Sequence, residues 1–497
     1  MRLRTSQMPS WLPSLASLLF LALLIRLWQW PSRRGPWIAT GLLVLGCIYG
    51  FHWIFISLHT YGLMNPVIAG TATGLLALYV ASYGILAGWL IRRSMRTSKG
   101  WAYGRSVWVV APAIAGLITL LEWTRGWLFS GFPWLGWGYQ QIDSWLSGFA
   151  PWLGVYGVTF FTALMAALIA AGRPQTLFAA LLVPLLGGAL GSTTFDRPVG
   201  EPLKVALIQG AVGQQMKFDP KSVEATKQRH LEMGAALSTP GVRVDLIVFP
   251  ETAFIQSWQD DPEATQGLQR LANRSGAAVM TGMPMRDPSG WHNSLVMLKP
   301  QQGEQPPESP EGRYDKHHLV PFGEFIPWGF RWFVNLMQMP LGDFQRGGRV
   351  QKSLPVDDQR IGVNICFEDL FGEELARGLA PSRDPSERPT ILLNLSNLAW
   401  FGDTIALPQH LDVARMRSLE LGRPSIRATN TGMTVHIDSR GQVQEKLAPM
   451  REGILLAQVQ GTEGVTPFVA IGNLGALLLA LLSLAGLWLG GRFRMAG

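Results

Sequence analysis

Ile361-Gly-Val-Asn-Ile-Cys-Phe-Glu-Asp-Leu-Phe371 is an apolar, strand-like pattern that runs into Cys366 and then turns acidic and helical. The pattern places Cys366 at the C-terminal end of a strand and at the start of a helix. A helix N-terminus presents oriented N–H groups, which favour a thiolate and can receive an oxyanion. The position therefore suits a nucleophile. Free cysteine is also among the most buried residue types, so a purely structural Cys366 stays open.

Two upstream segments repeat this placement of one reactive residue just beyond a strand-like run: Leu246-Ile-Val-Phe-Pro-Glu251 and Tyr314-Asp-Lys-His-His-Leu-Val-Pro-Phe-Gly-Glu324. A thiol nucleophile needs a base, and the carbonyl that it attacks needs a cationic or N–H partner for the developing oxyanion. Glu251 is the candidate base. Lys316 is the candidate oxyanion partner, and Glu324 could hold Lys316 charged.

The alternative interpretation of each charged residue is an ordinary solvated surface charge, but three coincident placements in one domain favour a catalytic group. His317 and His318, next to Lys316, offer a rival Cys–His pair. No Asn or Asp pattern identifies the orienting partner that such a pair needs. Glu251 is therefore the preferred base.

Composition narrows the class of protein. A chain of 497 residues is too long for one core, so we expect at least two domains. Hydrophobic content of 48%, only 15% charged residues and 20 Trp indicate a membrane protein with aromatic belts. The net charge is +8, but no basic stripe with interleaved aromatics predicts a nucleic-acid partner. Two cysteines, Cys47 and Cys366, exclude a disulfide-stapled secreted fold. We expect no cofactor and no metal.

Apolar runs long enough to cross about 30 Å of hydrocarbon as helices divide the chain. We expect about six N-terminal membrane spans, at roughly 12–30, 37–57, 65–91, 107–123, 145–171 and 176–195, and a further span over Phe468–Leu489. The residues between them carry the charges and Pro/Gly punctuation of a globular domain. The predicted organisation is a membrane domain over 1–195, an extracytoplasmic catalytic domain over 196–465, and a C-terminal span with a short cytoplasmic tail over 466–497.

Orientation follows from the basic residues of the loops, because Lys and Arg are retained on the cytoplasmic side. The first, third and fifth loops are basic, the second has no Lys or Arg, and the fourth has only Arg125. This distribution predicts that the globular domain lies outside the cytoplasm. Arg2 and Arg4 argue mildly against the outward N-terminus that this topology requires.

Within the globular domain, short apolar runs predict buried strands. These runs are Lys204–Gln209, Asp245–Phe249, Ala277–Thr281, Ser294–Leu298, Arg360–Cys366 and Thr390–Leu395. Helical patterns over Pro220–Leu237, Asp369–Leu379 and Gln409–Leu421 alternate with some of them. Such alternation favours an α/β layered sandwich.

The motifs around these residues resemble the Glu-Lys-Cys segments of the nitrilase, or carbon–nitrogen hydrolase, superfamily. More narrowly, the chain resembles the bacterial apolipoprotein N-acyltransferases over nearly its whole length, membrane spans included. The motifs that carry this second resemblance are Lys316–Pro327, Ser396–Gly402, Gln409-His410, Ala414–Arg417, Arg427–Gly432 and Gly131-Phe-Pro-Trp134.

The resemblance implies a polytopic α-helical membrane domain joined to a nitrilase-like αββα sandwich. It also implies transfer of an acyl chain from a phospholipid, through a thioester on Cys366, to the N-terminal amine of a diacylglyceryl-cysteine apolipoprotein. The expected partners are the phospholipid donor, the apolipoprotein acceptor and the lipid bilayer, and the expected location is the bacterial inner membrane with the catalytic domain on the periplasmic side. Phe367, Glu368, Trp400 and Asn293 are added as candidate substrate-binding residues.

Some features depart from the family pattern. Asp is common where Leu398 stands, Tyr is common where Phe367 stands, and the family has one more N-terminal span. Two other functions stay open. A membrane-tethered nitrilase-type amidase would use water as the acceptor, but a small-amide hydrolase has no need of several spans. A transporter with a non-catalytic domain would need paired charges within its spans, and these are almost absent.

Overall fold

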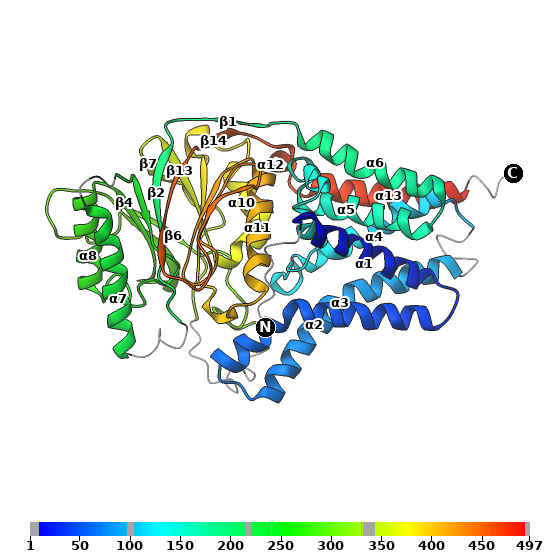
Figure 1. The fold of residues 1–497 in the computed structure, drawn as a ribbon, viewed down its shortest axis with the longest axis horizontal. Helices are drawn as coiled ribbons and strands as arrows, with labels where there is room; N and C mark the ends of the chain where they lie inside the picture. The colour runs from blue at the N-terminus through cyan, green and yellow to red at the C-terminus, as the bar shows by residue number, and fades with distance from the viewer. Residues whose placement is uncertain are drawn as a thin grey trace. The chain divides into compact units, whose positions relative to one another are not determined.

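The computed structural model describes residues 9–96, 104–213, 220–239, 241, 243–329, 331 and 343–492 (Figure 1). The chain divides into two compact units. The first consists of Met1–His52, Gly70–Thr194 and Thr466–Gly497, and the second of Trp53–Ala69 and Phe195–Val465.

The first unit is helical. Its helices are α1 (Trp11–Gln29), α2 (Arg34–Ile56, which ends in the second unit), α3 (Pro66–Arg96, which begins there), α4 (Val107–Arg125), α5 (Ala150–Ala171), α6 (Pro174–Gly191), α12 (Pro467–Ile471) and α13 (Leu474–Arg492). Among the described residues, six helices are long and apolar enough to cross a membrane, and α13 contributes a shorter apolar stretch, Leu474–Leu487. The predicted polytopic α-helical membrane region is confirmed.

Small residues allow the helices of this unit to approach closely. Helix α4 contacts both α5 and α13. A Cβ atom added to Gly116 of α4 would lie 2.5 Å from the carbonyl oxygen of Ala480 in α13, so no larger residue fits there without a shift. Close backbone approach of this kind drives association of apolar helices, for which the hydrophobic effect gives little preference within lipid.

The second unit contains two six-stranded sheets, in the orders β13-β2-β3-β4-β5-β6 and β12-β11-β10-β9-β8-β7. The strands of the first are β2 (Leu203–Gln209), β3 (Leu246–Val248), β4 (Ala278–Asp287), β5 (Gly290–Leu298), β6 (Gly312–Asp315) and β13 (Gly453–Val459). Those of the second are β7 (Leu354–Val356), β8 (Gln359–Ile365), β9 (Ile391–Ser396), β10 (Ser425–Thr429), β11 (Val435–Ile437) and β12 (Val443–Lys446). A separate pair joins β1 (Asp196–Pro198) to β14 (Thr462–Gly464).

The two sheets share one apolar core, because alternate residues of each strand face the other sheet. Leu207 of β2, Val248 of β3, Val363 of β8 and Leu393 of β9 belong to this buried cluster. Helices α7 (Pro220–Ala235) and α8 (Pro262–Ser275) cover the outer face of the first sheet, and α10 (Gly372–Leu379) and α11 (Ala406–Leu421) cover the outer face of the second (Figure 1). The predicted αββα sandwich is therefore confirmed.

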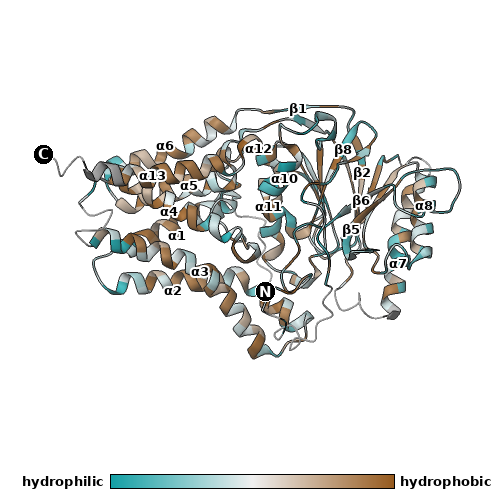
Figure 2. Ribbon diagram, turned by 180° about the vertical axis from the view of Figure 1, so that it is seen from behind, coloured by the Kyte–Doolittle hydropathy of each residue, from teal (hydrophilic) through white to brown (hydrophobic). Residues whose placement is uncertain are grey.

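Hydropathy follows these roles. In Figure 2 the helices of the first unit are brown along most of their length, whereas α10 and α11 alternate between teal and brown. In both sheets the central strands run parallel: β3 pairs with β2 and β4 in the first sheet, and β9 pairs with β8 and β10 in the second. The carboxyl ends of parallel strands meet at one edge of a sheet, which is where α/β proteins gather functional groups.

Candidate active site

The structure brings together three of the four predicted catalytic side chains by direct contact. Lys316 follows β6, and its Nζ lies 3.2 Å from Glu251 Oε1, just beyond β3, and 2.8 Å from Glu324 Oε1. The Lys316 side chain is 1% exposed. The charges of all three groups act on the thiol of Cys366, at the end of β8. Both carboxylates are held in place by the same ammonium.

Two asparagines complete the surroundings of the carboxylates. Asn293 Nδ2, on β5, donates to Glu251 Oε1 over 2.9 Å and to Glu324 Oε1 over 2.7 Å. The backbone N–H of Asn397 donates to the other oxygen of Glu251 over 2.8 Å. Glu251 thus accepts from three donors. This number of charge-assisted hydrogen bonds fixes its orientation within the buried site.

The electrostatics of the site keep Lys316 charged. Burial by itself lowers the pKa of the Lys316 ammonium, but the carboxylates of Glu251 and Glu324 outweigh it and raise that pKa well above its usual range. A buried ammonium between two carboxylates is a stable cation at neutral pH. Lys316 therefore supplies a fixed positive charge within this cluster.

The thiol behaves differently from the expectation based on the helix terminus. Desolvation, followed by the charge of Glu251, raises the pKa of Cys366 well above its usual range, although Lys316 opposes this. Cys366 also opens a short 3-10 helix, η8 (Cys366–Leu370), and the α-helix α10 begins only at Gly372. A raised thiol pKa means that Cys366 needs a base to become nucleophilic, which is the role predicted for Glu251.

Cys366, the predicted nucleophile, lies on a sharp turn. Cys366 has φ of 52°, in the left-handed region that non-glycine residues rarely adopt. Such a conformation costs of order 1–3 kcal/mol and persists only where neighbouring groups hold it. Glu368 is one of these groups, because its Oε2 accepts from the backbone N–H of Ile365 over 2.6 Å.

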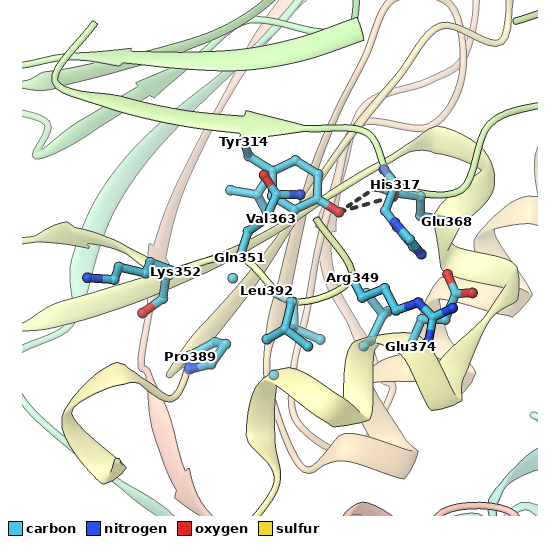
Figure 3. Close-up of a pocket in the computed structure, with 15 residues that line it drawn as sticks. Tyr314, His317, Arg349, Gln351, Lys352, Val363, Glu368, Glu374, Pro389 and Leu392 are labelled. Atoms are coloured by element: carbon cyan, nitrogen blue, oxygen red, sulfur yellow. Dashed lines mark hydrogen bonds between the residues drawn. The ribbon is translucent and has the colours of Figure 1, made fainter. Parts of the chain in front are cut away.

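The same carboxylate also holds the lysine loop. Glu368 Oε1 accepts from the backbone N–H groups of His317 over 2.7 Å and His318 over 3.0 Å. The hydroxyl of Tyr314 donates to Glu368 over 2.9 Å (Figure 3). Burial raises the pKa of Glu368 to about 7 despite these hydrogen bonds. Glu368 thus ties the segment that carries Lys316 to the turn that carries Cys366.

A small cavity of about 60 Å³ borders Glu368. Figure 3 shows the residues that line it. Its lining residues are Tyr314, His317, Arg349, Val350, Gln351, Lys352, Ser353, Gly362, Val363, Glu368, Glu374, Leu375, Gly378, Pro389 and Leu392. Glu368 thus belongs both to this lining and to the turn that carries Cys366, and Tyr314 bonds it there. Within the described ranges, no group of three or more His, Cys, Asp or Glu is arranged to hold a metal ion.

The remaining predicted residues lie close to this cluster in the fold. Phe367 is buried, and its ring lies 5.3 Å from that of Phe371. Trp400 is half-buried in the 3-10 helix η10 (Ala399–Phe401), shortly after Asn397. Asn293 and Glu368 contact protein groups as described above. The substrate-binding role of these four residues stays a prediction.

The two histidines of the rival Cys–His pair are bound to other groups. The Nδ1 atom of His317 lies 2.8 Å from the carbonyl oxygen of Gly347. The Nδ1 atom of His318 lies 3.1 Å from Glu374, and its ring stacks on Phe371 with a centroid distance of 3.5 Å. These partners lie outside the Glu251, Lys316 and Glu324 cluster, and the choice of Glu251 as the base stays a prediction.

Asn397, Asn394, His410 and Arg427 surround the site, and the sequence had assigned no role to them. A usable signal existed for two of them. Asn394 lies in β9 and Asn397 just beyond its end, at the sheet edge where the end of β8 places Cys366. A polar residue at the carboxyl end of a predicted neighbouring strand is a candidate for the same site.

Comparison with known proteins agrees with this geometry. Residues 204–467 match the carbon–nitrogen hydrolase family model, and residues 3–168 match that of the apolipoprotein N-acyltransferase N-terminal domain. The apolipoprotein N-acyltransferase of Ralstonia nicotianae is 41% identical over 95% of this chain and 88% of its own length. The enzyme of Bordetella bronchiseptica is 39% identical over 96% of this chain and 92% of its own length. The enzyme of Nitrosomonas europaea is 38% identical over 94% of this chain and 91% of its own length. With both halves matched and the carboxylate–lysine–cysteine cluster assembled, the chain belongs to the apolipoprotein N-acyltransferase family of bacterial acyltransferases.

Proposed function

We propose that this protein transfers an acyl chain from a membrane phospholipid to the N-terminal amine of a diacylglyceryl-cysteine lipoprotein, in two half-reactions through Cys366. The observation that carries the proposal is the ammonium of Lys316 shared between Glu251 and Glu324, whose charges all act on the thiol of Cys366. A base, a fixed cation and a nucleophile together suit acyl transfer.

In the first half-reaction, Glu251 removes the proton of Cys366 as Sγ attacks the ester carbonyl of the phospholipid. The negative charge that develops on the carbonyl oxygen is stabilised by Lys316. The carbon–oxygen ester bond then breaks, and the proton on Glu251 passes to the departing alkoxide. Lysophospholipid leaves, and the acyl chain remains on Cys366 as a thioester.

In the second half-reaction, the lipoprotein amine attacks the thioester carbonyl, and Lys316 again faces the oxyanion. Glu251 takes a proton from the attacking nitrogen, the carbon–sulfur bond breaks, and the thiolate of Cys366 recovers the proton. The products are an amide and the free enzyme. The same three side chains serve both steps.

Glu324 and Asn293 prepare the base for this task. If Glu251 were the only counter-ion of Lys316, its carboxylate would be committed to one strong ion pair. Glu324 shares that charge, and Asn293 spaces the two carboxylates by donating to both. Phe367 and Trp400 are proposed to contribute apolar surface for the acyl chain, and Glu368 to position the catalytic turn.

The proposed location is the bacterial inner membrane, with the catalytic domain on the periplasmic side. The apolar helices and the alternation of basic and non-basic loops support this orientation. The proposed domains are the membrane domain over 1–195, the catalytic domain over 196–465 and the C-terminal span over 466–497. The acyl donor would then reach the site from the surrounding bilayer.

Mass spectrometry of the protein incubated with phospholipid alone tests the proposal. We expect one acyl chain added to the peptide that contains Cys366, none on the peptide that contains Cys47, and no addition in Cys366→Ser. Addition of a diacylglyceryl-cysteine peptide should discharge the adduct and yield the N-acylated peptide. An adduct that decays equally fast without the amine would indicate a hydrolase, and acylation confined to Cys47 would refute the proposed nucleophile.

A further inference from the structure

A chain of buried polar side chains lies behind the nucleophile. Arg427 of β10 bonds Asp369 of η8 through Nη1, and its Nη2 lies 2.8 Å from Nδ1 of His410 in α11. Nε2 of His410 lies 3.3 Å from the carbonyl oxygen of Cys366. Asn394 Nδ2 lies 3.3 Å from the same oxygen. These four polar side chains are at most 3% exposed. Burying them costs folding free energy unless each one has hydrogen-bond partners.

The direction of the hydrogen bonds follows from chemistry. A guanidinium has only donors, so Nδ1 of His410 accepts from Arg427 and the ring carries its proton on Nε2. That proton is then donated to the carbonyl oxygen of Cys366. Burial, together with the charge of Arg427, holds the pKa of His410 well below its usual range, so the ring stays neutral. The chain thus ends in a fixed donor that faces the nucleophile's own peptide group.

Fixing this carbonyl also fixes the opposite side of the same peptide group. In a trans peptide the C=O and N–H point in opposite directions, so the orientation of the Cys366 carbonyl sets that of the Phe367 N–H. Hydrogen bonds to the carbonyl polarise the peptide and strengthen its N–H as a donor. The N–H after a nucleophile on such a sharp turn is suitably placed to receive an oxyanion.

We propose that Asp369, Arg427 and His410 form a positioning chain, which orients and polarises the Cys366–Phe367 peptide so that its N–H supports Lys316 at the oxyanion. His410 is a positioning residue, because it acts through the peptide rather than on the substrate. Cys366 has a left-handed φ of 52°, a conformation that persists only where surrounding contacts stabilise it. The hydrogen bonds from His410 and Asn394 to its carbonyl oxygen supply such contacts. This inference rests on the proposed role of Cys366 as the acylated nucleophile.

Comparing the rates of two reactions of the Cys366 thiol distinguishes a positioning role of His410 from a purely structural one. Acylation by phospholipid develops an oxyanion, whereas alkylation of Cys366 by iodoacetamide is a displacement at carbon that develops none. Cys366 is partly exposed, so the small reagent can reach it. In the full-length protein, His410→Leu is expected to slow acylation about 10-fold to 100-fold, below the loss for removing an oxyanion donor outright. Alkylation should stay within about threefold of the unaltered protein, because it needs no donor at an oxyanion.

His410→Gln is the conservative variant, because an amide can accept from Arg427 and donate to the Cys366 carbonyl. It should recover much of the acylation rate that His410→Leu loses. His230→Leu is the matched control, since His230 is equally buried on α7, its Nδ1 bonds the carbonyl of Thr226, and its ring packs near Phe249 and Phe254. The control should leave the ratio of the two rates unchanged.

Equal loss of both rates in His410→Leu, or no loss of either, would overturn the inference. If His410→Leu does not accumulate, Arg427→Lys takes its place, because one ammonium cannot reproduce the two-pronged contact to Asp369 and His410. If Arg427→Lys slows acylation but not alkylation, the proposed positioning chain is supported. If it slows both reactions equally, the inference is overturned. Absence of any adduct on the unaltered protein would refute the proposed function itself, whereas a normal adduct with an unchanged rate ratio would refute only this inference.

Discussion

Lys316 and Asn293 donate to the same two carboxylate oxygens, Oε1 of Glu251 and Oε1 of Glu324. The four atoms form a closed arrangement with donor–acceptor distances between 2.7 and 3.2 Å. Each donor therefore limits the movement of both acids. A change in any one member is expected to disturb the others, so single substitutions here should not be additive.

Lys316→Arg should lose acylation by about 10²-fold or more while the protein still accumulates in the membrane. The ammonium contacts two oxygens in a space that leaves it 1% exposed, and the larger planar guanidinium does not fit that geometry. The thioester formation rate and the amount of membrane protein check this outcome. Lys227→Arg is the matched control, because Lys227 is also buried and bonds Glu263 on the far side of the first sheet. Near-normal acylation by Lys316→Arg would reduce Lys316 to a structural charge.

Glu251→Gln should slow both thiol acylation and transfer to the amine by about 10²-fold or more, because the amide has no basicity. Glutamine offers one acceptor oxygen to the three donors that face Glu251. We therefore also expect a loss of about 1–3 kcal/mol in the free energy of unfolding. Thioester formation and melting temperature are measured on one preparation. A destabilised variant that still acylates at the normal rate would move the base to His317 or His318.

Asn293→Asp should slow acylation at least about tenfold, because it removes the shared donor and adds a third acid beside the thiol. The added negative charge would raise the pKa of Cys366 further and compete for the Lys316 cation. The rate of thioester formation at neutral pH checks this outcome. Asn273→Asp on α8 makes the same charge change outside the site and serves as the control. Equal rates for the two variants would contradict the bridging role of Asn293.

Glu368 should make stability depend on pH near neutrality. Burial raises its pKa from an ordinary 4.5 to about 7. Because the folded value lies above the unfolded one, the stabilisation by protonation is fully present below about pH 4.5 and is lost as pH rises through about 7. The effect is limited to about 3 kcal/mol.

Thermal unfolding of the unaltered protein and of Glu368→Gln at about pH 5 and about pH 8 tests this dependence. The variant loses hydrogen bonds at both pH values, so only the difference between the two conditions reports the ionisation. Between the lower and the higher pH, the melting temperature of the unaltered protein should fall further than that of the variant. Parallel behaviour would show that Glu368 keeps one ionisation state throughout.

The proposed topology predicts the behaviour of reporter fusions. A reporter that is active only in the periplasm should work when fused after Phe195 and fail when fused after Arg96. Immunoblots of both fusions control for expression. The reverse pattern would overturn the proposed orientation and, with it, the access of the catalytic domain to periplasmic lipoproteins.

Local pattern explains which elements could be predicted. The strands β2, β3, β8 and β9 match the predicted apolar runs closely, and β4 and β5 include theirs but are longer, because a strand buried on both faces needs a nearly continuous apolar sequence. Strand β10 escaped prediction because Arg427 stands at its centre, and a charged residue normally argues against a buried strand. The ion pair with Asp369 allows it there. Helix α8 was missed because its sequence is mostly polar and buries only one face.

The amino-acid sequence by itself determined the membrane spans, the buried strands and the position of Glu251, Lys316 and Cys366 beyond strand ends, because hydropathy period and chain punctuation are local properties. The tertiary structure alone decided which groups complete the site. Asn397 reaches Glu251 across 146 residues of sequence, and Arg427 reaches Asp369 across 58. It also decided the surroundings of Cys366, since burial and the neighbouring carboxylates raise the pKa of its thiol. No local pattern encodes such contacts, because they depend on how two sheets and their helices pack.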